Sequence, residues 1–584
     1  MPVKVIGKDI AIKMNKLKES RLCSGKVICM LLAAAAILLN IKYIFVDFGI
    51  DAEYQIVMAY RLAKGELMFK EMWEINQMSA FLCAFFIKIY LALFQTTTGM
   101  VLYLQIVGVL LDAGIALLLY HTASKYLGSK RMAFAMAWLF FIIAPKDVPI
   151  AEYANMQIWF SMLLVLAIFS YFQTGKKRMI IFAALSLCGA VLAYPSCLLL
   201  VVGILFLFIR YGKKQDFMLL MTICAVAGIC YMGMILRYMS PDEFLHAFEN
   251  MRLIEVAHAV GIVEKFGAYL VDAGKIALFS GVAYGASMGL VKLIGCKREY
   301  AQDKEKCGIM VDCLFFMVVL LVCVYTIINM DVYVRYCYAL TFIVIIMLGM
   351  RYAKRLTGNK HMFYICGTTV SLLNFLATLI LTDLELVGSL PYLLIALVVA
   401  ILPIGELLKN VAWKEKTGRT VKVTIVAAAI FLMFRNAYVI RPMYLQAFSI
   451  FEVGGIVKDG PALGMISDYM GAYMQNESMK EWEQYIEDGS KIYLIGDPLD
   501  VLGYLYADTE IAAPTVMCTP GYNEGIAEYW EMNPDKYPDV VVASCWYGTM
   551  NGALSEDSWI RKWLEEEFQP THYTDGKYWR YYYR

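Results

Sequence analysis

Long apolar runs recur along the first 440 residues of the chain, and short charged segments separate them. Most of the runs approach the ~20 residues that a helix needs to cross a bilayer, and their apolar residues are continuous rather than alternating. Lipid offers the backbone no hydrogen-bond partner, so only helices or closed barrels can span it. The pattern therefore predicts a polytopic α-helical membrane protein. The predicted runs are 27–46, 78–94, 100–120, 132–144, 156–173, 179–194, 196–209, 217–236, 274–294, 310–329, 337–350, 362–381, 389–408 and 421–440.

Basic segments between these runs predict the topology, because cytoplasmic loops are enriched in Lys and Arg. If all of these segments are cytoplasmic, successive runs cross the membrane in alternating directions. The exception is 78–94, which would then begin and end on the outer face. We expect 78–94 to be re-entrant or to lie along the interface, leaving about thirteen spans with the N-terminus inside and the C-terminus outside. The alternative, in which 78–94 spans and segment 125–131 lies outside, stays open. The basic segments are 1–26, 125–131, 175–178, 210–214, 296–306, 351–355 and 409–422.

The pattern changes after Arg441. Two short apolar runs, KIYLIGD (491–497) and DVVVASC (539–545), are typical of buried parallel strands, and residues 555–568 predict a helix that begins at a Ser N-cap. The chain closes on GKYWRYYYR, which predicts an aromatic strand. These elements indicate a small soluble α/β domain.

Composition and charge support this division. Of the 584 residues, 60% are hydrophobic and 17% are charged, against ~45–50% and ~25% in soluble proteins. Residues 441–584 hold 23 acidic and 10 basic side chains, whereas the first 440 residues hold 27 and 42. A basic membrane part joined to an acidic tail argues against nucleic-acid binding. We therefore expect a cytoplasmic N-terminus (1–26), a membrane domain (27–440) and an extracytoplasmic α/β domain (441–584).

The two long outer loops are predicted at 47–77 and 237–273. The first is rich in acids, and its run D-A-E-Y-Q places Asp51 and Glu53 two residues apart at the end of the first apolar run. Carboxylates are costly near lipid and usually have a function there. One of them could be a general base for an acceptor hydroxyl or amine, and the other could orient it or bind a metal. The alternative is a solvated acidic loop.

The segment from Asp51 to about Phe94 resembles the opening of the GT-C glycosyltransferases, membrane enzymes that use sugars linked to polyprenyl phosphate. It is most similar to the bacterial branch related to dolichyl-phosphate-mannose–protein mannosyltransferases and the aminoarabinose transferase (family 39-like). The matching residues, in order and spacing, are Asp51, Ala59, Gly65, Phe69-Lys70-Glu71 and Trp73. The sequence departs from the family pattern where the second acid is displaced to Glu53, and where Asn76-Gln77-Met78 replaces a Lys-Pro-Pro-like element.

The resemblance implies roles for further residues. Asp51 would be the catalytic residue, assisted by Glu53, and Glu71 would orient Asp51 or the acceptor. Family members carry an Arg-Tyr at the outer start of a late span, where it is expected to meet the lipid phosphate. Arg335, between Tyr333 and Tyr336, matches this position, and a snorkelling interfacial Arg is the alternative.

Two more residues complete the predicted substrate-binding set. Glu152 lies in the outer loop PKDVPIAEYAN, near where family enzymes often have an acid; a plain loop acid is the alternative. Lys88, within run 78–94, could be a buried partner of Asp51 or of the phosphate, or a snorkelling side chain.

The resemblance implies an inverting hexosyl or pentosyl transferase in a bacterial plasma membrane. It would move a sugar from a polyprenyl-phosphate donor to a glycan, lipid or protein acceptor of the envelope. No cofactor is expected, although a divalent metal at Asp51 and Glu53 stays open. A polysaccharide or lipid transporter or flippase is the alternative function. It would need charged residues along a path through the bilayer, but apart from Lys88 and Asp112 the runs hold almost none.

Overall fold

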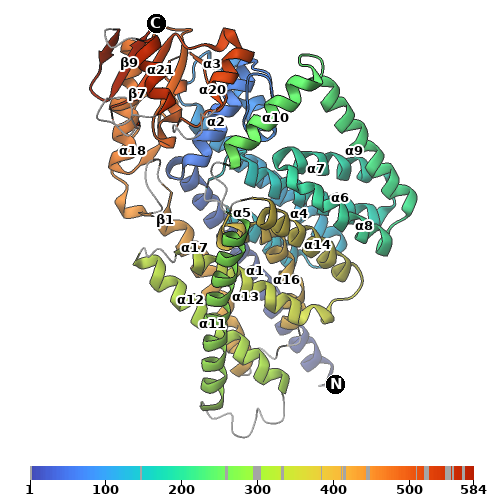
Figure 1. The fold of residues 1–584 in the computed structure, drawn as a ribbon. Helices are drawn as coiled ribbons and strands as arrows, with labels where there is room; N and C mark the ends of the chain where they lie inside the picture. Colours follow the sequence, from blue (N-terminus) through green and yellow to red (C-terminus); the bar gives the residue numbers. More distant parts are fainter. Residues whose placement is uncertain are drawn as a thin grey trace.

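The structure is a computed structural model in which a bundle of helices carries a sheet-containing domain at one end (Figure 1). It describes residues 3–584 with gaps. The residues outside the description are 145–147, 257–260, 294–303, 330–333, 383, 410, 412–415, 442, 444–447, 508, 519–524, 546–553, 555–557 and 569–571.

Each of the fourteen predicted apolar runs forms a helix. Ten of the described helices are long and apolar enough to cross a membrane, and the remaining predicted runs correspond to α5, α7, α8 and α13. The protein is therefore a multi-pass membrane protein, as the pattern predicts. The helices before residue 441 are α1 (Val3–Val46), α2 (Ile50–Lys64), α3 (Ala80–Phe94), α4 (Met100–Tyr126), α5 (Lys130–Ile142), α6 (Tyr153–Thr174), α7 (Lys177–Ala193), α8 (Leu200–Tyr211), α9 (Lys214–Ile235), α10 (Pro241–Val256), α11 (Ile262–Leu293), α12 (Lys304–Ile328), α13 (Val334–Tyr352), α14 (Gly358–Leu381), α15 (Leu386–Ser389), α16 (Leu394–Lys409) and α17 (Lys416–Tyr438).

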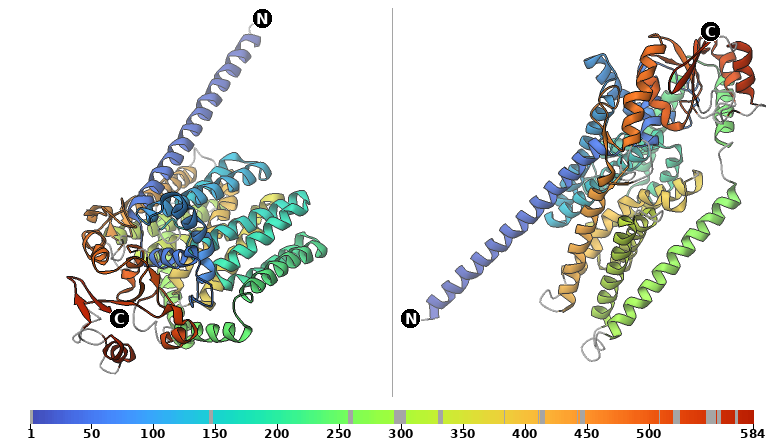
Figure 2. Two further views of the ribbon diagram at one scale, coloured as in Figure 1. Left: turned by 90° about the horizontal axis from the view of Figure 1, so that it is seen from above. Right: turned by 90° about the vertical axis from the view of Figure 1, so that its left-hand side faces the viewer.

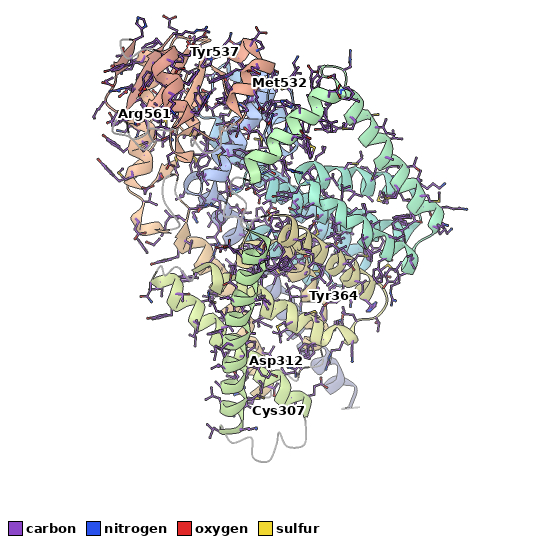
Figure 3. The ribbon with its side chains drawn as sticks, in the orientation of Figure 1. Cys307, Asp312, Tyr364, Met532, Tyr537 and Arg561 are labelled. Carbon is purple, nitrogen blue, oxygen red and sulfur yellow. The ribbon has the colours of Figure 1, made fainter. Side chains whose placement is uncertain are left out.

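Described residues of three predicted basic segments, 125–131, 296–306 and 351–355, lie near one another at the end of the bundle opposite the C-terminal domain. There Arg351 and Tyr352 both contact the carboxylate of Asp312, each at 2.6 Å. Figure 3 shows Asp312 and Cys307 at this end and Met532, Tyr537 and Arg561 at the other. The amide of Asn359 donates to the carbonyl of Tyr126 at 3.2 Å, which brings segment 125–131 to the same end. This grouping agrees with the topology in which 125–131 lies inside.

Helix α3 is preceded by the short helix η1 (Gln77–Ser79), and its start packs on α6 through Phe81 and Phe160, while segments before and after it contact the C-terminal domain. Before it, the Trp73 amide donates to the carbonyl of Pro514 at 2.8 Å. After it, the Thr97 hydroxyl donates to the carbonyl of Leu505 at 2.6 Å. Figure 1 shows α3 at the same end of the molecule as that domain. Although 77–94 is long and apolar enough to span, these contacts favour the re-entrant or interfacial prediction.

The C-terminal domain is built on a five-stranded sheet of order β6-β5-β7-β9-β8. Strand β5 is parallel to β6 and β7, and β9 is antiparallel to β7 and β8. Residues 540–543 of β7 are buried, as expected of a central strand covered on both faces. The three strands predicted from sequence are thus β5, β7 and β9, and the predicted helix is α21. The strands are β5 (Lys491–Ile495), β6 (Glu510–Ile511), β7 (Val540–Ser544), β8 (Tyr573–Asp575) and β9 (Trp579–Tyr583), and the helices are α18 (Tyr469–Tyr473), α19 (Trp482–Tyr485), α20 (Ile526–Met532) and α21 (Trp559–Glu567).

Two small antiparallel pairs connect this domain to the bundle: β1 (Val439–Ile440) with β2 (Phe448–Ser449), and β3 (Gly455–Ile456) with β4 (Ile466–Ser467). Figure 2 shows helix α1 projecting away from the rest of the molecule toward the N-terminus. Its other end joins the start of the C-terminal domain, because the amide of Arg441 donates to the Asp47 carboxylate at 2.8 Å. The ends of α1 and α17 therefore lie beside the first outer loop.

Candidate functional site

Asp51 lies in the first turn of α2, the short helix that follows the first span. Asp51 and Glu53 are both in this turn, where the helix dipole favours carboxylates. Asp51 is partly exposed, whereas Glu53 is 1% exposed. Residues two apart on a helix do not face the same way. The two predicted catalytic acids therefore have different surroundings.

The surroundings of Asp51 are polar and aromatic. The hydroxyl of Tyr153, at the start of α6, hydrogen-bonds to Asp51, and Glu152 and Tyr194 also interact with Tyr153. The rings of Tyr153 and Tyr194 lie 5.9 Å apart. We call Asp51, Glu152, Tyr153 and Tyr194 the outer-face cluster. It brings together three predicted outer segments that are far apart in the sequence.

Glu152 has a structural role within this cluster. It is the N-cap of α6, and its carboxylate accepts a hydrogen bond from the amide of Asn155 at 2.9 Å. A carboxylate at this position satisfies one of the free N–H groups at the helix start. Glu152 thereby holds the first turn of α6, and with it Tyr153, against Asp51.

Glu53 instead faces the C-terminal domain. Burial raises its pKa well above the usual range, and the nearby carboxylates of Asp500 and Asp497 raise it further. Both belong to the segment that contains η8 (Pro498–Leu505). Burial also raises the pKa of Asp500, to about 7, with Asp497 adding to the shift. We call Glu53, Asp497 and Asp500 the interface acids.

Glu74 and Arg61 attach the first outer loop to the same domain. Glu74 accepts hydrogen bonds from the hydroxyls of Tyr54 at 2.9 Å and Thr515 at 2.8 Å, and from the Val516 amide. Arg61 is fully buried and pairs with Glu66 at 2.7 Å and with Glu74 at 3.8 Å. Burial raises the pKa of Glu74 above its usual range. Arg61 and these hydrogen bonds lower this pKa and offset part of the effect of burial.

Glu71 belongs to this interface and not to the outer-face cluster. Its carboxylate accepts a hydrogen bond from the amide of Leu67 at 2.7 Å and lies 3.9 Å from Lys536 of the C-terminal domain. Lys536 is buried and also pairs with Glu66 at 3.2 Å and Glu510 at 3.4 Å. The predicted substrate contact of Glu71 is thus placed among ion pairs that join the loop to the domain.

The remaining predicted residues are placed as follows. Lys88 is exposed on α3, beside other exposed residues such as Phe85 and Ile89. Tyr333 lies outside the described residues. Arg335 and Tyr336 are in the first turn of α13, but their side chains are not among those that the structure describes. Their proposed contact with phosphate therefore remains a prediction.

Several charged residues inside the apolar runs were not predicted as part of the site, and Lys42 and Arg435 are two of them. Lys42 of α1 forms an ion pair with the fully buried Asp47 at 2.8 Å and donates to the carbonyl of Val439 at 2.6 Å. Arg435 of α17 is 6% exposed, and its guanidinium donates to Asn436 at 3.1 Å. The sequence signal for both residues is a charged side chain within an apolar run. Placing such a side chain in the membrane costs free energy unless it is paired, so it often marks a structural or functional contact.

Comparisons with known proteins add little to this geometry. No protein-family model matches the chain, and no curated protein matches it. Among solved structures, one match is the archaeal oligosaccharyltransferase AglB from Archaeoglobus fulgidus, in complex with an inhibitory peptide and a dolichol-phosphate. It is 12% identical, with a TM-score of 0.42, and the match covers 88% of this chain and 69% of that one. At this level the similarity carries no argument about function.

The chemistry available at the outer-face cluster is that of one accessible carboxylate held by a phenol. Asp51 can accept a proton, and Tyr153 can orient it. Among the residues that the structure describes, no group of three or more His, Cys, Asp or Glu side chains is arranged to hold a metal ion. Asp51 and Glu53 in particular do not share a face of α2, so the described geometry supports a single general base rather than a metal-binding pair.

Proposed function

We propose that this protein is an inverting, GT-C-like glycosyltransferase that uses a sugar linked to polyprenyl phosphate. The donor is presented on the outer face of a bacterial plasma membrane, and the acceptor belongs to the cell envelope. The motif from Asp51 to Trp73 supports the family, and the outer-face cluster supports the site. The observation that carries the proposal is the partly exposed Asp51 at the start of α2, held by the hydroxyl of Tyr153.

In the proposed reaction, a hydroxyl or amine of the acceptor attacks the anomeric carbon of the sugar. The proton of the nucleophile passes to the carboxylate of Asp51, and the bond between the anomeric carbon and the phosphate oxygen breaks. Polyprenyl phosphate leaves with the electron pair. Cationic side chains would stabilise the charge that develops on the phosphate, which is a large contribution in this kind of chemistry. Arg335 is proposed for this role.

Glu53 takes a different role from the one that the motif implies. The carboxyl of Glu53 is buried against the C-terminal domain and lies away from the outer-face cluster, so we assign proton transfer to Asp51 alone. Glu53 would position the first turn of α2 by packing against the C-terminal domain. Glu71 and Glu74 would act at the same interface, by holding the loop that follows α2.

The interior of the bundle favours an enzyme over a transporter. A transport path needs polar groups that face an open route through the membrane. Two described polar pairs join α6 to α14: Asn374 donates to Ser161 at 2.7 Å, and Gln157 donates to Thr378 at 3.3 Å. The described cavity between α5, α12, α13, α16 and α17 is only about 20 Å³, which is room for about one water.

The proposal is tested by comparing envelope glycans from cells that carry wild-type protein or Asp51→Asn. The amide keeps the size of the side chain but cannot accept a proton, so we expect the sugar to be lost from the envelope. Asp242→Asn, at an exposed acid of α10, is the matched control and should leave the glycans unchanged. An unchanged envelope in Asp51→Asn, with the protein folded and present at the normal level, would refute the assignment.

A further inference from the structure

The C-terminal domain has a groove that the proposed reaction does not use. It lies between the β3–β4 hairpin on one side and α18 with the following helical turn η6 (Met474–Ser478) on the other, and its volume is about 830 Å³. Small-molecule sites are typically ~300–1,000 Å³. We call it the tyrosine groove, after Tyr469 and Tyr473 in its wall.

The two tyrosines lie next to each other in the wall of the groove, and Tyr473 also contacts Tyr578. They are four residues apart on α18, which places them on one face of the helix. Their ring planes are inclined by 18° and their centroids are 6.1 Å apart. Asp468 holds the start of α18, because its carboxylate accepts hydrogen bonds from the amides of Met470 at 3.1 Å and Gly471 at 3.3 Å. Tyr469 is 68% exposed, so its ring is available to a ligand.

The opposite wall is held in place by Asn476. Its side-chain amide donates to the carbonyl of Ile456 at 3.0 Å, and its oxygen accepts from the Lys458 amide at 2.8 Å. These two bonds occupy backbone groups at the edge of the β3–β4 hairpin, where another strand could otherwise pair. The groove is therefore preorganised and is not an open sheet edge for a peptide strand.

The charges that line the groove balance. Lys458 and Lys480 are matched by Asp459 and Glu477, and Lys480 pairs with Asp459 at 2.9 Å. A lining without net charge offers little attraction to an anion such as a phosphate. It does provide both hydrogen-bond donors and acceptors beside an aromatic face. Sugars need this combination, because their hydroxyls donate and accept while their C–H faces pack on aromatic rings.

The position of the groove connects it to the outer-face cluster. The loop at its edge meets the start of α4, where the Gly99 amide donates to the carbonyl of Gly460 at 2.9 Å. The phenol of Tyr506 interacts electrostatically with both Asp459, on the groove rim, and Glu53 of α2. The groove thus lies at the outer end of a membrane span, with Tyr506 between it and the helix that carries Asp51.

We propose that the tyrosine groove binds a neutral carbohydrate chain, the glycan acceptor of the reaction. The inference rests on the proposed function only in calling this glycan the acceptor. The rings of Tyr469 and Tyr473 pack against sugar faces, and the balanced charges of the rim bond to sugar hydroxyls. This selects a glycan over a protein or lipid as the acceptor.

The test measures binding of trisaccharides to the purified full-length protein in lipid nanodiscs by saturation-transfer NMR. The probes are mannotriose, maltotriose and chitotriose, with trigalacturonic acid as the anionic comparison. We expect at least one neutral trisaccharide to bind the wild type more tightly than the anionic one does. Tyr469→Ala should raise its Kd about two- to tenfold, the range for loss of one aromatic contact. Tyr573→Ala, at an exposed tyrosine of β8, is the matched control and should leave Kd unchanged.

Three outcomes would overturn the proposal. These are no binding of any neutral trisaccharide, binding that is insensitive to Tyr469→Ala, and binding of trigalacturonic acid as tight as that of every neutral probe. Asp51→Asn separates the two hypotheses. If it binds the trisaccharide like the wild type but abolishes transfer, both stand. If the envelope is unchanged in Asp51→Asn while binding still depends on Tyr469, the proposed function fails and the glycan site stands.

Discussion

Replacing Asp500 by Asn should make the junction between α2 and the C-terminal domain more stable at neutral and alkaline pH. Asp500 is 4% exposed, and one of its oxygens accepts a hydrogen bond from the amide of Asp497 at 2.7 Å. Asn can accept the same bond through its side-chain oxygen. The substitution therefore keeps the local geometry and removes only a buried negative charge, which lies near Glu53 and Asp497 and beside the buried thiol of Cys518.

The magnitude follows from the pKa of Asp500, which is raised from 3.8 to about 7. One pKa unit corresponds to ~1.4 kcal/mol, so the shift corresponds to about 4 kcal/mol. A carboxyl with a raised pKa in the folded state contributes stability that is fully present below about pH 4 and is lost as pH rises to about 7. Above pH 7, the ionised side chain destabilises the junction by up to this amount, and Asn does not.

The assay is the unfolding temperature of the protein in nanodiscs between pH 5 and pH 8.5, followed by tryptophan fluorescence. We expect the wild-type value to fall as pH rises, and the Asp500→Asn value to fall less and to exceed it at pH 8. Asp488→Asn, at an exposed acid of the same domain, should follow the wild type. The reasoning would be wrong if Asp500→Asn were less stable than the wild type at pH 8 with an unchanged pH slope.

Three further predictions test the topology, the outer-face cluster and the domain junction. A Cys placed at Gln95 should react with a membrane-impermeant thiol reagent from outside and a Cys at Ser129 should not; labelling of position 129 would overturn the thirteen-span topology. Tyr153→Phe should lower kcat of the proposed transfer about tenfold with little change in KM, as loss of one hydrogen bond to Asp51 predicts; an unchanged kcat would remove Tyr153 from the site. Lys536→Met should destabilise the junction by about 2 kcal/mol, because it removes a buried ammonium that pairs with Glu66, Glu71 and Glu510 while Glu66 keeps Arg61; unchanged hydrogen exchange in residues 65–77 would contradict this.

The sequence by itself determined the class of protein and the position of the apolar helices and of three strands of the C-terminal sheet. Continuous apolar runs must become helices in lipid, so all fourteen runs are helices in the structure. The strands β5, β7 and β9 were predictable for a similar reason, because short apolar runs bounded by turns can be buried on both faces of a sheet. The mismatch between basic segments and alternating spans also predicts that 78–94 is re-entrant or interfacial, which stays a prediction because the same segment is long and apolar enough to span.

The tertiary structure alone decided what the acids of the first outer loop do. The family resemblance placed Asp51 first and Glu53 and Glu71 as its assistants, but the sequence does not say which side of α2 the C-terminal domain covers. Once that domain packs on the loop, Glu53 is buried against it and Glu71 lies beside Lys536, whereas Asp51 stays partly exposed beside Tyr153. Tyr153 reaches Asp51 from another helix, a contact between residues about a hundred positions apart that no local pattern encodes. The pattern of apolar residues predicts which side of a single segment is buried. A functional site depends on which distant segments contact each other in the tertiary structure, and that pattern does not specify those contacts.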